Sequence, residues 1–299
     1  MEYQTFLKRI LTKVNALLPE GRSAEYHEVK KNNGAAYTGI VMKPCASLGA
    51  SPIYYMESIF ESVSFDGFSD EKEIDGELAE IAKKIAESLL KQPPKPSNLK
   101  VLNDPEYVKS HVIYRLVGRE MNLEMLEDLV HRDFLDMAVV YAVSVFDDQI
   151  GSGLVAVSRS FAEDMGICEE ELFGLARENT ARLFGERMVS FGEIVPLPRE
   201  EGDLQDFAYV LSNEQAFYGA AALLYSGEIR RLAETLESDL YILPASVHEV
   251  IVLPKREREL PFLREMVRNV NRQEVKREDV LTDSVYVYDL LEDRLKVAS

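Results

Sequence analysis

Residues 206–255 constrain the fold more than any other part of the chain, because elements of different periodicity follow one another there without a long connection. Residues 207–211 form a short apolar run. The strands predicted next, at 240–243 and 247–253, are rich in β-branched residues and bracketed by prolines. Two amphipathic helical segments lie between the apolar run and the first of these strands. This succession predicts an α+β fold in which helices flank a mixed or antiparallel sheet.

Ser212 ends the first apolar run and marks the predicted start of a helix. Gln215 follows three residues later, which is the spacing of a capping box. The predicted inward stripe of this helix contains Phe217, Ala220, Ala221 and Leu224. Gly219 and the alanines after it keep the helix thin, so we expect close packing against the sheet. Gly227 then separates it from a second amphipathic helix over residues 229–236.

Residues 1–92 are predicted to form a small N-terminal α+β unit. Its amphipathic helices are expected over residues 1–18, 52–64 and 71–90. Residues 32–34 (Asn-Asn-Gly) join two extended runs, and Asn-Gly supplies the positive φ angles that a hairpin turn needs. The proline-rich residues 92–97 predict a linker, because three prolines favour an extended spacer. A larger C-terminal α+β domain is therefore predicted over residues 98–299.

Within this larger domain, the pattern predicts strands, helices and hairpins at 111–117, 122–129, 137–158, 159–166, 169–184 and 285–297. The order of strand, serine and two helical segments occurs at residues 155–184 and again at 209–237, which raises the hypothesis of an internal duplication. Asn179 lies on the apolar stripe of the helix 169–184. A polar side chain at such a position is more often a structural hydrogen-bonding group than part of a site.

The charge balance limits the classes of partner. The chain of 299 residues has 34 Lys+Arg and 52 Asp+Glu, a formal net charge of -18, which disfavours nucleic acids and anionic membranes as partners. Cys45 and Cys168 lie in unlike contexts and predict neither a disulfide framework nor a zinc site. The N-terminus lacks the apolar core of a signal peptide, and no stretch reaches the roughly 20 apolar residues of a membrane span. These features predict a cytoplasmic protein.

Residues 255–278 are basic within this acidic chain, with eight Lys+Arg against five Asp+Glu. Phe262, Met266 and Val270 recur at i, i+4 and i+8, which predicts a helix that docks by this stripe and has a solvated basic face. Nucleic-acid binding through the basic face of this helix is a second interpretation. The net charge of -18 makes it the weakest alternative.

No complete catalytic signature is present. The chain contains neither the GxxxxGK[ST] phosphate loop nor GxGxxG after a strand, and its four histidines form no HExxH motif, so no cofactor and no metal are predicted. A nucleophile hypothesis joins Ser246 to His248, with Glu249 as the carboxylate, or uses Ser212 near the same strand ends. On a strand, Glu249 points away from the other two. A hydrolase that uses Ser246 and His248 is therefore kept as the alternative function.

Three motifs carry a resemblance to a known family. HRDFLDMAVVYAVSV, YVLSNEQAFYGAAALLY and DLYILPASVHEVIVLP are similar to segments of an uncharacterised family of bacterial proteins from Gram-positive anaerobes, described only as a domain of unknown function. The resemblance covers nearly the whole chain. It implies a cytoplasmic bacterial protein and carries no activity.

The function that these observations favour is non-enzymatic binding or regulation, with recognition of a protein or a small ligand. The candidate binding residues lie at predicted strand ends and are Ser212, Asn213, Ser246 and His248. We expect them to converge at one edge of the sheet. Side chains alternate along a strand, so His248 is also expected to share a face with Val250 and Val252.

Overall fold

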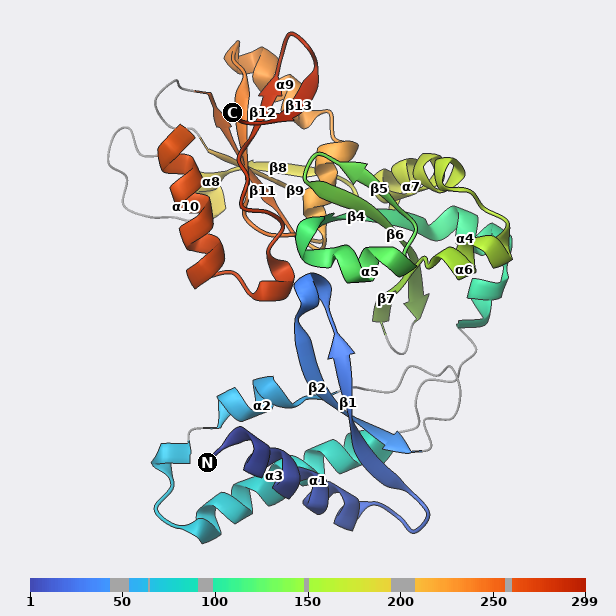
Figure 1. Ribbon diagram of the computed structural model, residues 1–299, viewed down its shortest axis with the longest axis vertical. Helices are drawn as coiled ribbons and strands as arrows, with labels where there is room; N and C mark the ends of the chain where they lie inside the picture. The colour runs from blue at the N-terminus through green and yellow to red at the C-terminus, as the bar shows by residue number, and fades with distance from the viewer. Residues whose placement is uncertain (44–53, 64, 91–98, 148–150, 195–207, 256–259) are drawn as a thin grey trace. The chain divides into compact units, whose positions relative to one another are not determined.

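The computed structural model of the chain describes residues 1–43, 54–63, 65–90, 99–147, 151–194, 208–255 and 260–299. By its contacts the chain divides into two compact units (Figure 1). The first contains Met1–Lys31, Ala35–Asn103 and Phe146–Gly151, and the second contains Asn32–Gly34, Asp104–Val145 and Ser152–Ser299. The proline-rich residues 92–97, predicted as a linker, lie outside the described residues.

The first unit packs helices on an antiparallel sheet of order β1-β2-β3. Its elements are α1 (Tyr3–Leu17), β1 (Ser23–Lys30), β2 (Ala36–Lys43), β3 (Tyr54–Tyr55), α2 (Met56–Ser62) and α3 (Glu71–Leu90). α1 and α3 bury the stripes that their periodicity predicts, and the core contains Phe6, Ile10, Val14, Leu78, Ile85 and Leu89. The helix predicted over 52–64 begins only at Met56, because Tyr54 and Tyr55 pair with β2 as a short strand.

β1 and β2 form the predicted hairpin, paired from Ser23 and Lys43 to Lys30 and Ala36. In the connection, Asn33 and Gly34 have φ angles of 59° and 63°. These left-handed conformations are the ones that an Asn-Gly pair accommodates with least strain. The hairpin prediction is confirmed.

The second unit contains a four-stranded sheet built around one long strand. β6 (Met137–Asp147) pairs antiparallel with β4 (Val112–Gly118) and with β5 (His131–Phe134), and it also pairs with β7 (Gly151–Ala156). The helices of this part are α4 (Pro105–His111), α5 (Leu123–Asp128), α6 (Arg159–Met165) and α7 (Glu169–Phe184). The predicted hairpin of β6 and β7 and the predicted helices α5, α6 and α7 are confirmed, whereas α4 and β5 were not predicted.

Asn179 fastens α7 to the region where α4 meets β4. Its Nδ2 donates hydrogen bonds to the carbonyl oxygens of Lys109 and Val112 at 2.9 and 3.0 Å. The next residue also contacts β4, since Thr180 Oγ1 accepts a hydrogen bond from the backbone N–H of Tyr114 at 3.1 Å. Asn179 is therefore a structural hydrogen-bonding residue. This is the more common of the two roles expected for a polar side chain on an apolar stripe.

A second sheet of the same unit has six antiparallel strands in the order β13-β12-β10-β11-β9-β8. The elements are β8 (Arg187–Ser190), α8 (Phe191–Ile194), β9 (Tyr209–Ser212), α9 (Glu228–Leu236), β10 (Leu240–Pro244), β11 (Val250–Pro254), α10 (Leu260–Gln273), β12 (Tyr286–Asp289) and β13 (Arg294–Val297). α10 lies along this sheet (Figure 1). Antiparallel sheets flanked by helices confirm the α+β class.

The two segments that raised the duplication hypothesis differ in their surroundings. β7 precedes α6 and α7 and pairs with β6, within the four-stranded sheet. β9 instead lies between β8 and β11, and a 3₁₀ segment, Gly219–Leu224, follows where the first segment has a helix. These differences do not support an internal duplication.

Candidate functional site

The structure brings three of the four candidate residues into contact. Ser212 ends β9, and its hydroxyl donates a hydrogen bond to the carbonyl oxygen of His248 at 2.8 Å. The backbone N–H of His248 donates to Ser246 Oγ at 3.0 Å. Ser212 and Asn213 are only 6% and 3% exposed. The candidates converge, but their side chains are hydrogen-bonded to neighbouring protein groups, and only Ser246 and His248 are partly exposed.

Asn213 organises a turn where the sequence predicts the first turn of a helix. Its Oδ1 accepts hydrogen bonds from the N–H groups of Gln215 and Phe217 at 3.2 and 3.1 Å, and its Nδ2 donates to the Phe217 carbonyl at 2.8 Å. Ala216 and Tyr218 have φ angles of 50° and 52°, which a right-handed helix excludes. Phe217, between them, is 43% exposed.

The predicted capping box at Ser212 is therefore wrong, and so is the helix that it was expected to start. The Ser212 hydroxyl is directed to the backbone of His248, 36 residues away in the chain, and not to the next turn. The 3₁₀ segment begins at Gly219, which approaches the sheet closely. A Cβ at this position would lie 2.1 Å from Ser212 Oγ and 2.5 Å from the His248 carbonyl oxygen, so only glycine fits.

The strand predicted from residue 247 begins three residues later. The N–H groups of Ala245 and Ser246 both donate to the carbonyl oxygen of Glu249 at 3.2 Å, which closes a turn before β11. His248 therefore lies in this turn and does not share a strand face with valines.

The imidazole of His248 is engaged at both nitrogens. Nδ1 accepts a hydrogen bond from the Tyr218 N–H at 3.0 Å, and Nε2 lies 3.3 Å from Asp279 Oδ1. The ring also packs against Phe217 and Tyr218, with centroid distances of 5.9 and 5.5 Å. A general base needs a free ring nitrogen that reaches the nucleophile. This arrangement favours a structural role for His248 and does not favour the hydrolase alternative with Ser246.

α10 docks by a different stripe from the one predicted. Leu263, Val267 and Asn271 are the buried residues of this helix. The Asn271 Nδ2 donates to the Thr282 carbonyl at 3.0 Å and to Asp283 Oδ1 at 2.8 Å. The prediction of an inward stripe at 262, 266 and 270 is wrong because the helix carries two apolar stripes, and the one that includes Asn271 satisfies a buried amide.

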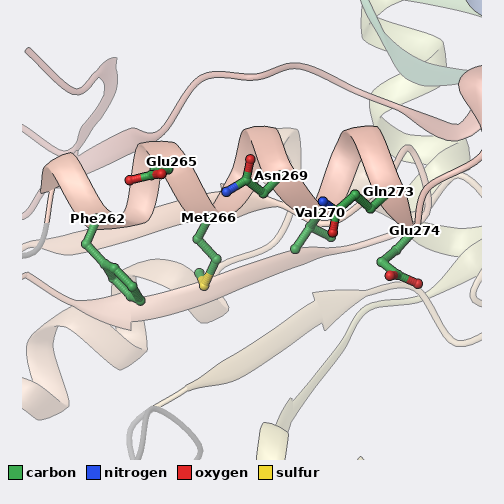
Figure 2. Close-up of a pocket in the computed structure, with 7 residues that line it drawn as sticks. All are labelled: Phe262, Glu265, Met266, Asn269, Val270, Gln273 and Glu274. Carbon is green, nitrogen blue, oxygen red and sulfur yellow. The ribbon is translucent and has the colours of Figure 1, made fainter.

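The other stripe of α10, which we call the outer stripe, consists of Phe262, Met266 and Val270. Phe262 is 58% exposed and Val270 is 41% exposed. The stripe borders a hollow of about 470 Å³, and Figure 2 shows its side chains on one side of the helix. The described lining consists of Phe262, Glu265, Met266, Asn269, Val270, Gln273 and Glu274. Apolar side chains in the middle and carboxylates at the margin are typical of a surface that binds a partner.

The comparison with protein families decides the identification. A family model described as "Family of unknown function (DUF5688)" matches residues 3–290. The chain belongs to this family. The expected membership of an uncharacterised family is confirmed, while the bacterial source stays a prediction. No curated protein and no solved structure matches the chain. None of the described helices has the length and apolar character needed to cross a membrane.

This DUF5688 chain also contains a charged cluster at the start of α7 that the sequence analysis did not identify. Arg132 Nε and Nη2 donate to the two carboxylate oxygens of Glu169 at 2.8 and 2.7 Å, and the Tyr141 hydroxyl donates to Glu169 as well. Burial by itself raises the pKa of the Glu169 carboxyl, but these hydrogen bonds outweigh burial and hold the pKa below its usual value.

We expect Glu169→Gln to lower the free energy of unfolding at pH 7 by about 2 kcal/mol, because charge-assisted bonds from Arg132 and Tyr141 are lost. A lowered folded-state pKa stabilises the protein above the usual value of 4.5, and this stabilisation disappears as the pH falls through the folded-state pKa. Urea unfolding at pH 7 and below pH 4 measures the difference. Glu178→Gln, an exposed position of the same helix, is the control and should change stability by less than about 0.5 kcal/mol. An equal loss for Glu169→Gln at both pH values would contradict the assignment.

Proposed function

We propose that the protein is a non-enzymatic binding or regulatory protein of the cytoplasm that recognises another protein through the outer stripe of α10. The observation that supports this most directly is the exposure of Phe262 and Val270 on a helix whose neighbouring stripe, Leu263, Val267 and Asn271, is already buried. Cys168, an exposed free cysteine, supports a reducing compartment.

Burial of the outer stripe provides a driving force for association. Removal of apolar surface from water contributes roughly 25 cal/mol per Å², and a large aromatic side chain at the centre of a patch often dominates the energy of an interface. Phe262 is a large aromatic side chain of this kind at one end of the stripe, and Met266 beside it is partly buried against the core and completes the apolar surface. The hollow of about 470 Å³ along the helix offers room for side chains of the partner. The surface therefore suits recognition of a protein segment.

The earlier candidate residues support a different role. Ser212 and Asn213 are buried, and their side chains hold the turn before Gly219. His248 is hydrogen-bonded at both ring nitrogens. These residues are better suited to positioning the turn than to binding a small ligand. Nucleic-acid binding through α10 stays the weakest alternative, since the net charge is -18 and Arg264 donates a hydrogen bond to the Ala298 carbonyl.

The experiment that tests this proposal is site-specific photo-crosslinking in the cells that naturally produce the protein. A benzophenone amino acid placed at Phe262 is expected to form an adduct with one protein, identified by mass spectrometry. The same probe at Leu291, which is 97% exposed and lies in the connection between β12 and β13, is the matched control and should give no such adduct. Val270→Ser should reduce the yield from position 262. Equal adducts at both positions, or none at 262, would refute recognition through the outer stripe.

A further inference from the structure

We infer that the segment recognised by the outer stripe is an amphipathic α-helix of another protein, with lysine or arginine residues beside its apolar face. This inference rests on the proposed function and names the chemistry of its partner. Three features support it: the spacing of the stripe, the charge of its margin and the charge of the whole chain.

The spacing of the outer stripe matches that of a helical partner. Phe262, Met266 and Val270 follow one another at i, i+4 and i+8, so they lie along one side of α10 over about 12 Å. Two helices pack by placing ridges of such spacing into each other's grooves, and amphipathic helices are commonly recognised through anchors at i, i+3 or i+4, and i+7. A partner helix of about three turns therefore presents its anchors at the right intervals.

The margin of the hollow is acidic. Glu265 and Glu274 line it together with the amides of Asn269 and Gln273, and no lysine or arginine occurs among its described lining residues. Both glutamates are exposed, and neither has an ion pair within the described part of the chain. Cationic side chains on a partner complement these carboxylates, and the net charge of -18 attracts such a partner from a distance.

A second copy of this chain fits the surface less well. Two chains that each carry a net charge of -18 repel one another. The three partly exposed side chains also supply only a fraction of the area that permanent homodimers bury, whereas transient complexes with another protein bury less. The same negative charge disfavours binding to a membrane, because the acidic margin repels anionic head groups.

Three labelled peptides test the inference by fluorescence anisotropy with the full chain. The first is an amphipathic peptide with leucines at i, i+4 and i+8 and lysines at the flanking positions. The second keeps the leucines and replaces lysine by glutamate, and the third has the composition of the first in scrambled order. We expect the first peptide to bind at least tenfold more tightly than either of the others.

Protein variants locate the binding. Phe262→Ser with Val270→Ser should weaken binding of the first peptide at least tenfold without any change in charge, whereas Leu291→Ser should leave it unchanged. Glu265→Gln with Glu274→Gln should weaken it about threefold. Glu77→Gln with Glu80→Gln, which removes the same two charges from exposed positions of α3, is the matched control and should have no effect.

Each contrary outcome overturns the inference. If the scrambled peptide binds equally well, net charge alone attracts the first peptide. If the acidic peptide binds equally well, the carboxylates at the margin do not discriminate between basic and acidic partners. If the chain forms a dimer in analytical ultracentrifugation, and this dimer dissociates in the Phe262→Ser, Val270→Ser variant, the outer stripe binds a second copy of the chain. If the outer stripe binds anionic vesicles, its partner is a membrane. Crosslinks from position 262 without peptide selectivity refute this inference alone, and the absence of both refutes the proposed function as well.

Discussion

A Gly219→Ala variant is expected to have a free energy of unfolding about 3 kcal/mol lower than that of the wild-type chain. The added Cβ would lie 2.1 Å from Ser212 Oγ, 2.5 Å from the His248 carbonyl oxygen and 2.6 Å from the Asn213 nitrogen. Two of these are backbone atoms, which cannot move aside as the end of a flexible side chain can, so relief requires the turns that adjoin β9 and β11 to shift. Urea unfolding followed by circular dichroism measures the loss, and faster hydrogen exchange in β9 and β11 locates it.

Gly174→Ala is the matched control for this substitution. Gly174 lies within α7, and a Cβ there would meet nothing within 4 Å. Alanine in a helix interior is favoured over glycine by roughly 0.5 to 1 kcal/mol, so this variant should be more stable than the wild-type chain. If Gly219→Ala also raises stability, the 3₁₀ segment does not pack closely against Ser212 and His248.

Replacement of Asn33 by alanine is expected to destabilise the second unit by about 3 kcal/mol, since buried polar groups lose their partners. Asn33 is 1% exposed, and its Nδ2 donates to the carbonyl oxygens of Arg277 and Val280, both at 2.7 Å. Its Oδ1 accepts from Asn122 Nδ2 at 2.7 Å, and its N–H donates to Asn122 Oδ1 at 2.7 Å. Hydrogen exchange of β4 and of residues 277–282, with urea unfolding, measures the change.

Two further variants separate the causes of this loss. Glycine adopts the φ angle of 59° that Asn33 has, so Asn33→Gly should be about 1 kcal/mol more stable than Asn33→Ala while it still lacks the amide. Combining Asn33→Gly with Asn122→Ala should cost less than the sum of the two, by about 1 kcal/mol or more, because the side chains are direct partners. Wild-type stability in Asn33→Gly would show that the amide contributes nothing.

Local patterns predicted the elements well where one apolar stripe or one turn signal dominates. α3 has the bounds 71–90 that its periodicity predicts, because its apolar residues form a single stripe. The hairpin of β1 and β2 follows from the Asn-Gly pair, since few other residues tolerate two successive left-handed φ angles. β12 and β13 also form the predicted terminal hairpin, at the edge of the six-stranded sheet.

The same patterns gave wrong predictions where the neighbouring residues were equally consistent with two structures. α10 has apolar residues at 262, 266 and 270 and also at 263 and 267, and periodicity cannot choose between the two stripes. The Ser212 and Gln215 pair has the spacing of a helix start, yet the partner of the Ser212 hydroxyl is His248. One sequence feature distinguishes the two stripes of α10. Asn271 continues the stripe of residues 263 and 267, and its amide binds Thr282 and Asp283 when this stripe is buried.

The sequence by itself determined the α+β class, most of the helices and hairpins, the charge of -18 and the membership of an uncharacterised family. Only the tertiary structure decided which side of α10 is buried, why residue 219 is glycine and what the amides of Asn33 and Asn122 bind. Periodicity reports the spacing of side chains along one element. The choice of a buried face and of a hydrogen-bond partner depends on groups far away in the chain, as for Asn33 and Asn122, which are 89 positions apart.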